Sequence, residues 1–299
     1  MRILDKDRQP VVLALGYFDS VHVGHREVIL TAKRVAEQLK SKLVVFTFDG
    51  NLRAVIGKDK KSFVFSSKER EKLILSLGVD KVYFAPLTKE FLSLTKREFL
   101  NFLNELYNVK CYVSGSDYRF GKGAEGSVEY LREFAKEKKQ KVITTPDVMC
   151  EGFKVSTTRV KEFLEKGDVK AVNKLLGTRY FVSGKVIHDR GVGRTLGYPT
   201  ANVKVLKEKQ TLRFGVYKGR VIVDGREYLA VINYGNRPTF NNENVVLEGH
   251  LIGYSGNLYD KEITFLFDDF IRDVKTFSSK EELIKQLEKD IEIVVNKND

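Results

Sequence analysis

The first 180 residues alternate short apolar runs with segments whose apolar residues recur every three or four positions. The apolar runs predict buried strands at residues 11–15, 43–48, 81–84, 111–114 and 142–144. The periodic segments predict helices at residues 24–39, 68–77, 96–107 and 128–136. Strands that alternate with helices in this way indicate a parallel sheet covered by helices, which is an α/β fold.

After residue 177 the pattern changes to short runs of alternating apolar and polar residues, separated by Gly, Asn and Asp. These runs predict antiparallel strands at residues 181–186, 216–223, 228–233, 245–252 and 262–267. Short strands of this kind favour a small β-barrel. Residues 278–282 have the character of a capped helix start, and an apolar face follows through Val294. We therefore expect two domains, at residues 1–180 and 181–299.

The segment that joins the first predicted strand to the first predicted helix reads GYFDSVHVGH, at residues 16–25. Ligands of parallel sheets bind beyond the carboxyl ends of the strands, where this segment falls. The start of a helix favours an anion, and glycine lets the anion approach the backbone closely. His22 and His25 are then placed to donate to phosphate oxygens. Two other interpretations stay open, which are a satisfied surface pair and a metal site with Asp19.

This segment resembles the GxFDxxHxGH signature of the HIGH-type nucleotidylyltransferases. Later motifs narrow the resemblance to the prokaryotic bifunctional riboflavin kinase/FAD synthetases, over nearly the whole chain. It implies a Rossmann-like nucleotidylyltransferase domain with a parallel sheet, then a small antiparallel β-barrel riboflavin kinase domain with a C-terminal helix. His22 and His25 are catalytic by this resemblance. The residues of the same segment that it assigns to nucleotide binding are Gly16, Phe18, Asp19 and Gly24.

The implied activities are phosphorylation of riboflavin to FMN by ATP and Mg²⁺-dependent adenylylation of FMN to FAD with release of pyrophosphate. ATP is the co-substrate of both reactions. Each reaction depends on positioning of the phosphates and on neutralisation of their charge. The resemblance therefore implies riboflavin, FMN and ATP as binding partners and Mg²⁺ as the cofactor.

Two further segments of the first domain resemble motifs of this family. Residues 114–121, SGSDYRFG, resemble the GxDFxFG loop, which implies a nucleotide contact by Asp117 and flavin contacts by Tyr118 and Phe120. A strand-terminal turn is the plainer interpretation. Residues 155–161 resemble the ISSTxxR motif, where a Ser/Thr helix cap explains the hydroxyls equally well. Its implied nucleotide-binding residues are Ser156, Thr157, Thr158, Arg159 and Lys161.

The first domain departs from the family in two places. The arginine of the ISSTxxR motif falls on Lys161, which keeps the positive charge but loses the planar fork that fits a phosphate. Relatives continue after the second strand with Pro-His-Pro, whereas residues 49–52 are DGNL here. An alternative function is therefore a riboflavin kinase with a weak or degenerate adenylyltransferase domain.

The second domain contains the most specific motif, GKVIHDRGVGRTLGYPTAN at residues 184–202, which resembles the GxVxHGxxxGRxLGxPTAN region of riboflavin kinases. Glycines allow a loop to surround phosphates with backbone donors, although Gly-rich loops also join strands in many barrels. Thr200 and Asn202 offer oxygen ligands suited to Mg²⁺. The nucleotide-binding residues implied here are Gly184, Lys185, Gly191, Gly193, Arg194 and Gly197.

Glu248 lies in an alternating strand, where a solvated carboxylate is the default interpretation. The resemblance implies that it is the general base for the ribityl 5'-hydroxyl. Residues 233–240 resemble an NxGxRPTF loop, and residues 270–277 resemble RDExxF except that Val274 replaces the glutamate. The flavin-binding residues that these two motifs imply are Asn233, Arg237, Arg272 and Phe277.

The composition, with 42% hydrophobic and 31% charged residues, is that of a globular protein. The formal net charge of +12 is compatible with anionic partners, but basic runs are short or mixed with acids, and no nucleic-acid module is evident. No apolar run approaches the roughly 20 residues that span a bilayer. We expect a cytoplasmic enzyme without nucleic-acid or membrane partners. A basic nucleic-acid-binding or flavin-sensing protein without turnover is the alternative from another class.

Overall fold

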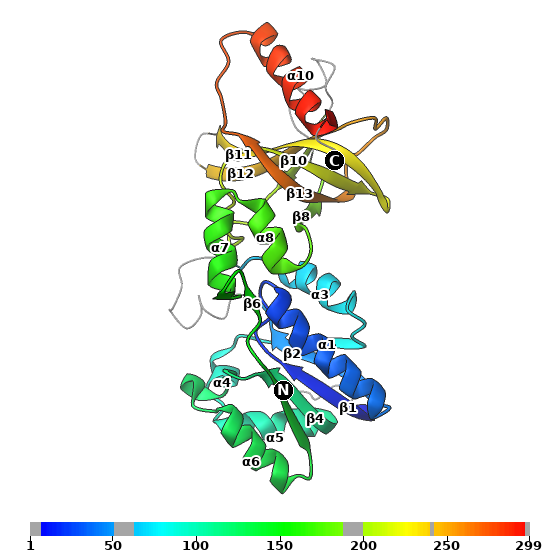
Figure 1. Ribbon diagram of the computed structural model, residues 1–299, viewed down its shortest axis with the longest axis vertical. Helices are drawn as coiled ribbons and strands as arrows, with labels where there is room; N and C mark the ends of the chain where they lie inside the picture. The colour runs from blue at the N-terminus through cyan, green and yellow to red at the C-terminus, as the bar shows by residue number, and fades with distance from the viewer. Residues whose placement is uncertain (1–6, 51–62, 188–199, 240–241, 297–299) are drawn as a thin grey trace. The chain divides into compact units, whose positions relative to one another are not determined.

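The computed structural model describes residues 7–50, 63–187, 200–239 and 242–296. Contacts within the chain divide it into two compact units, Met1–Thr157 and Thr158–Asp299 (Figure 1). The first unit contains a parallel sheet and the second an antiparallel sheet. The α/β class expected for the first half and the antiparallel strands expected for the second are therefore confirmed.

The sheet of the first unit has five parallel strands in the order β3-β2-β1-β4-β5. The strands are β1 (Asp7–Leu15), β2 (Lys42–Phe48), β3 (Lys81–Ala85), β4 (Tyr107–Gly115) and β5 (Lys141–Thr145). The helices are α1 (Val23–Gln38), α3 (Ser67–Leu75), α4 (Lys89–Leu92), α5 (Lys96–Leu106) and α6 (Val128–Glu137), with a 3₁₀ turn at Lys122–Ala124. A hairpin of β6 (Met149–Cys150) and β7 (Phe153–Lys154) follows.

Helices cover both faces of this sheet, with α1 and α3 on one face and α5 and α6 on the other (Figure 1). This cover explains why β2 reads as a continuous apolar run, since residues 43–47 are all buried. The strand order reverses between β1 and β4, where Leu15 lies opposite Ser114. Chains that leave neighbouring strands in opposite directions open a crevice beyond their carboxyl ends, which is the usual ligand site of such sheets.

The second unit begins with two helices, α7 (Thr157–Lys166, whose first residue ends the first unit) and α8 (Val169–Leu176). Its antiparallel sheet has the order β8-β13-β10-β11-β12-β9. The strands are β8 (Tyr180–Lys185), β9 (Thr200–Lys204), β10 (Gly215–Val223), β11 (Arg226–Thr239), β12 (Asn242–Leu251) and β13 (Glu262–Arg272). The sheet curls until its edges meet, because Val186 bridges to Val203 and the Ile187 amide donates to the Asn202 carbonyl at 2.9 Å.

Helix α10 (Lys280–Asn296) covers the outside of this curled sheet, as expected for an amphipathic closing helix (Figure 1). Val294 of α10 packs with Val216 and Val231 of the sheet. Asp290 of α10 is fully buried and receives two hydrogen bonds from Nε and Nη2 of Arg272 at 2.9 and 2.6 Å. A buried carboxylate requires such a partner, so this ion pair fixes the position of α10 on the sheet.

Candidate active sites

The turn between β1 and α1 has a strained backbone. Phe18 and Val21 adopt φ values of 47° and 46°, a left-handed conformation that is costly for a β-branched residue. The Phe18 ring folds back over Gly16, where an added Cβ would lie 2.6 Å from the ring. The same ring meets the edge of the His25 imidazole at a centroid distance of 5.3 Å. Packing therefore holds this turn in one shape, as a preorganised binding site requires.

His22 and His25 lie together at the start of α1. Their rings stack with a centroid distance of 3.6 Å, and Nδ1 of His22 accepts a hydrogen bond from the His25 amide at 3.1 Å. Gly24 allows this geometry because an added Cβ would lie 3.1 Å from the His22 ring. Burial lowers the pKa of His22 to about 2, with a further contribution from His25. Burial and the charge of Arg70 lower the pKa of His25 to about 3.

Both imidazoles are therefore neutral at physiological pH. Since Nδ1 of His22 is an acceptor, the single proton of this neutral ring is on Nε2, which becomes its donor. Nδ1 of His25 is buried and has no hydrogen-bond partner among the described residues. Buried polar atoms usually have a partner, so this atom indicates a place for a ligand. The pair can bind phosphate oxygens as neutral donors.

Asp19 and Thr157 join the two ends of the first unit at this turn. The Thr157 hydroxyl donates to Oδ1 of Asp19 at 2.7 Å and lies 2.9 Å from the Ser20 hydroxyl. Asp19 and Ser20 are buried, with exposed fractions of 2% and 0%. The structure thus brings the start of the ISSTxxR-like segment to the double-histidine turn, although the two are about 140 residues apart.

Lys154 contacts the predicted site residue Asp117 and was not predicted from the sequence. Its Nζ lies 2.8 Å from carboxylate oxygens of both Asp117 and Asp147. These hydrogen bonds raise the pKa of Lys154 and lower that of Asp117. The charge of Lys154 also adds to burial and His25 in lowering the pKa of His22. Lys154 therefore ties the hairpin of β6 and β7 to Asp117 in the loop after β4.

Arg70 of α3 is the second residue that was missed, and it is fully buried. Its guanidinium donates to the carbonyl oxygens of Tyr17 at 3.2 Å and Phe48 at 2.8 Å and to the Ser67 hydroxyl at 3.1 Å. Arg70 therefore ties together the segments that follow β1 and β2. The sequence could have indicated that Arg70 is buried, because Arg70 lies three and four residues before the apolar residues Leu73 and Ile74 and therefore on the inner face of the helix.

The other predicted residues of the first domain occupy different environments. Phe120 is 5% exposed and packs on Phe99 at a centroid distance of 5.5 Å, whereas Tyr118 is half-buried and stacks on Phe120 at 5.6 Å. Their contact with flavin stays a prediction. Ser156 precedes α7 and is half-buried. The residues of this motif that lie in α7 beyond the limit of the first unit are Thr158, Arg159 and Lys161.

A polar row crosses three strands of the second unit. Glu248 of β12 lies directly opposite Asn202 of β9 and Asn233 of β11. Opposed residues of neighbouring strands place their side chains on the same face of a sheet. The Thr200 hydroxyl donates to Oε1 of Glu248 at 2.7 Å. The structure therefore brings the predicted base Glu248 together with the two predicted metal ligands and the predicted flavin contact.

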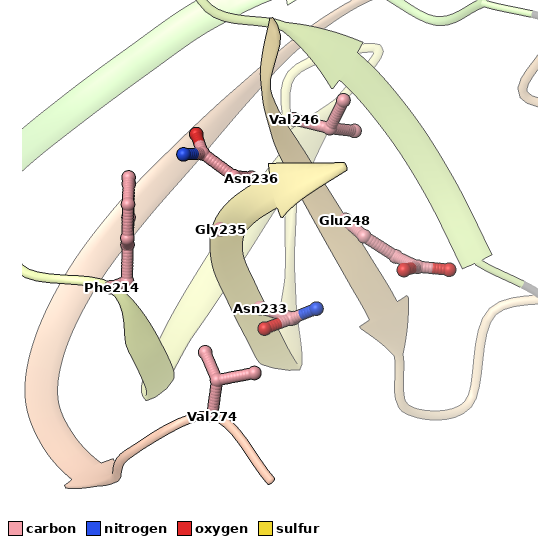
Figure 2. A pocket seen from close by; sticks show the side chains of 7 residues that line it. All are labelled: Phe214, Asn233, Gly235, Asn236, Val246, Glu248 and Val274. Atoms are coloured by element: carbon pink, nitrogen blue, oxygen red, sulfur yellow. The ribbon is translucent and has the colours of Figure 1, made fainter. Parts of the chain in front are cut away.

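Glu248 also lines a pocket of about 290 Å³. Figure 2 shows Asn233, Asn236 and Glu248 as its polar side chains, with apolar walls at Phe214, Val246 and Val274; Gly235 completes the lining. Apolar walls with a few oriented polar groups are typical of small-molecule sites. The pocket therefore suits an aromatic ligand with a polar edge.

The structure describes five of the nine remaining predicted residues of the second domain. The Arg272 guanidinium is bound by Asp290. Phe277 is half-buried and lies in the chain segment that joins β13 to α10. Gly184 allows the sheet to close, since an added Cβ would lie 2.3 Å from Val203, and Lys185 forms an exposed ion pair with Asp260 at 2.9 Å. Arg237 lies in β11. The predicted residues outside the described part of the chain are Gly191, Gly193, Arg194 and Gly197.

Two family models match this chain. The FAD synthetase model matches residues 4–159, and the riboflavin kinase model matches residues 176–297. The first match includes the double-histidine turn and the second includes Glu248, so each candidate site lies within its own family region. Among the residues that the structure describes, no helix is both long enough and apolar enough to span a membrane.

Curated relatives match almost the whole chain. The bifunctional riboflavin kinase/FMN adenylyltransferase of Bacillus subtilis is 32% identical over 96% of this chain and 92% of the relative. The protein of the same name from Escherichia coli K12 is 31% identical over 93% and 90%. A crystal structure described as a macrolide-efflux protein from Streptococcus pneumoniae has a TM-score of 0.86 and 31% identity, over 98% of this chain and 96% of that one. The chain therefore belongs to the family of bifunctional riboflavin kinase/FMN adenylyltransferases.

Proposed function

We propose that Glu248 is the general base with which the second unit phosphorylates riboflavin. The chain is an enzyme with riboflavin, FMN and ATP as its substrates. The observation that carries the base assignment is the Glu248 carboxylate, which lines the pocket and is oriented by the Thr200 hydroxyl at 2.7 Å. Glu248 takes the proton of the ribityl 5'-hydroxyl while its oxygen attacks the γ-phosphorus of ATP. The bond to the β,γ-bridging oxygen breaks, and ADP leaves.

The pocket beside Glu248 is the proposed site of the isoalloxazine ring. Phe214, Val246 and Val274 supply apolar contact area, and the Asn233 amide is placed to meet the polar edge of the ring. Asn233 is opposite Glu248 across the strand pair, so a flavin held there would direct its ribityl chain along the same face toward the base. This placement supports the flavin contact predicted for Asn233.

Thr200 and Asn202 are the proposed ligands of Mg²⁺. Together with Glu248 they offer only oxygen donors, from a hydroxyl, an amide and a carboxylate, which is the set that Mg²⁺ prefers. Asn202 is 6% exposed, so its amide has a defined orientation. When bound, Mg²⁺ neutralises charge on the transferring phosphoryl group.

The first unit is the proposed site of adenylyl transfer. A phosphate oxygen of FMN attacks the α-phosphorus of ATP, and pyrophosphate leaves. His22 and His25 donate to the phosphate oxygens as neutral imidazoles. The full-length relatives and the FAD synthetase match support both activities over a kinase with a degenerate first domain.

Product analysis tests both assignments of activity. The purified chain should convert riboflavin, ATP and Mg²⁺ first to FMN and then to FAD, with ADP and pyrophosphate as the other products. Chelation of divalent cations should stop both steps. FMN that accumulates without FAD would favour the alternative with a weak first domain, and absence of both products would contradict the proposal.

We also propose that the domains at residues 1–180 and 181–299 are the two catalytic halves, with α8 as a support of the second. The Asn173 side chain of α8 donates to the Phe267 carbonyl at 2.8 Å and accepts from the Tyr180 amide at 2.6 Å. Val172 and Leu176 of the same helix are fully buried. These contacts fix α8 to β8 and β13.

A chain that begins at Thr158 should therefore fold and phosphorylate riboflavin. A chain that begins at Thr178 lacks both α7 and α8 and should be less stable by at least about 3 kcal/mol, because it exposes the surface that the two buried aliphatic side chains of α8 cover. Chemical unfolding of both chains measures the difference. Equal stabilities would show that α7 and α8 contribute nothing, and an inactive, folded chain from Thr158 would contradict the division into halves.

A further inference from the structure

An ion pair lies immediately outside the proposed flavin pocket. Nη2 of Arg213 is 2.8 Å from Oδ1 and 3.1 Å from Oδ2 of Asp273. Phe214 and Val274, which are the next residues in the chain, both line the pocket. The pair therefore connects two segments, one before β10 and one after β13, that each contribute one apolar wall.

Arg213 is held in place by contacts other than this ion pair. Its amide donates to the Leu164 carbonyl at 3.0 Å, and its carbonyl accepts from the Tyr217 hydroxyl at 2.6 Å. Its guanidinium lies 4.6 Å from the centre of the Phe270 ring. Gly167 leaves room for the side chain, since an added Cβ would lie 3.0 Å from Cδ of Arg213. These contacts hold Arg213 in one position in the second unit.

The chain segment that begins at Asp273 is held less firmly than Arg213. Arg272 is anchored by Asp290, and its Nη1 donates to the Asp273 carbonyl at 3.0 Å, but Val274 is 53% exposed. Beyond Asp273 no strand or helix begins until Lys280. The ion pair with Arg213 is consequently a side-chain attachment that draws this segment toward Phe214.

We infer that the Arg213–Asp273 pair is a positioning device that sets the width of the flavin pocket and hence the affinity for riboflavin. This inference rests on the proposed function, in which the flavin ring lies against Phe214 and Val274. The side chains of the pair are 44% and 66% exposed. Exposed ion pairs contribute little to folding, so their loss should act on the pocket and leave the fold intact.

The test is a double-mutant cycle on the full chain, with Arg213→Ala, Asp273→Ala and both together. Asp273→Ala should raise KM for riboflavin about fivefold, the upper limit for an exposed pair, with kcat, KM for ATP and the thermal midpoint unchanged. In the Arg213→Ala background the same change should have no further effect, because the partner is already absent. Titration of riboflavin fluorescence should show the same loss of affinity.

A matched control is Arg97→Ala in the first unit. Arg97 also forms an exposed ion pair, at 2.9 Å from Glu137, and lies 5.8 Å from the Phe134 ring, but it does not belong to the residues that line the kinase pocket. It should leave KM for riboflavin unchanged. An unchanged KM in Asp273→Ala, or effects that multiply in the double variant, would overturn the inference while the wild-type activity still supports the proposed function. A wild-type chain that does not phosphorylate riboflavin would overturn the proposed function itself.

Discussion

Replacement of Glu248 with Gln is expected to lower the rate of FMN formation about 10²–10⁴-fold, the usual contribution of a positioned general base. Glutamine keeps the size of the side chain and can still accept from the Thr200 hydroxyl, which now lies 2.7 Å from Oε1. It cannot take the proton of the ribityl hydroxyl. The loss should therefore appear in kcat, with little change in KM for riboflavin. Initial rates with separated riboflavin and FMN measure it.

The same variant contains its own control for folding. FAD formation from added FMN depends on the first unit and should continue at the wild-type rate. Glu227→Gln is a matched control, because Glu227 is an exposed strand residue whose Oε2 lies 3.5 Å from Arg179, outside the pocket. It should leave FMN formation unchanged. A Glu248→Gln chain that forms FMN at the wild-type rate would show that another group accepts the proton.

The alternation of apolar and polar residues was sufficient to predict most strands of both sheets. In the first unit β2 is buried on both faces, so it appears as an apolar run at residues 43–48. In the second unit one face is exposed, and the period of two is visible. β9 was missed because it has only five residues, and residues 201–203 are all buried although Asn202 is polar.

Helix α8 was missed for a related reason. It has eight residues and is followed by Gly177 in the left-handed conformation, so its apolar face covers barely two turns. An apolar face this short is hard to distinguish from an irregular connection. Its stability comes from tertiary contacts such as those of Asn173 with Phe267 and Tyr180, which no local pattern records.

The resemblance led to the proposed catalytic residues, but the environment of each had to come from the structure. Nothing in the sequence indicates that the rings of His22 and His25 stack at 3.6 Å or that the pKa values of both lie far below that of a free imidazole. The partners Lys154 and Asp147 come from a hairpin and a loop whose placement depends on the whole unit. Arg272 was predicted to contact flavin, yet its guanidinium is bound by Asp290 of α10, so its flavin contact stays a prediction.

Replacement of both His22 and His25 with Ala is expected to reduce FAD formation from FMN by about 10³-fold or more, since one lost donor to a transition-state oxyanion typically costs about 10²–10³-fold. Riboflavin phosphorylation should remain near the wild-type rate, because Glu248 and its pocket lie in the second unit. The two rates are measured on the same preparation. A metal site at this turn predicts a different result, namely loss of a stoichiometric bound metal, which elemental analysis detects.

The low pKa values of His22 and His25 also predict how the stability of the folded state depends on pH. With pKa values of about 2 and 3, the folded imidazoles stay neutral as the pH falls, whereas an unfolded histidine takes up a proton below about pH 6.5. Unfolding therefore binds protons, and the two histidines make the folded state less stable as the pH drops below about 6.5. The double Ala variant lacks these two protonations, so its thermal midpoint should fall less between pH 6.5 and pH 4 than that of the wild type.

Catalysis by neutral donors also has a kinetic consequence. His22→Gln keeps an N–H donor near the position of Nε2 without a charge, and it should retain more adenylyl transfer than His22→Ala at every pH. If the histidines acted as cations, their pKa values would have to lie near 6.5 and not at about 2 and 3. Gln and Ala would then be equally inactive, and the wild-type rate would rise as the pH fell from 8 to 6. FAD formation by all three chains between pH 6 and pH 8 separates these cases. Equal rates for the wild type and the double Ala variant would remove the double-histidine turn from the reaction altogether.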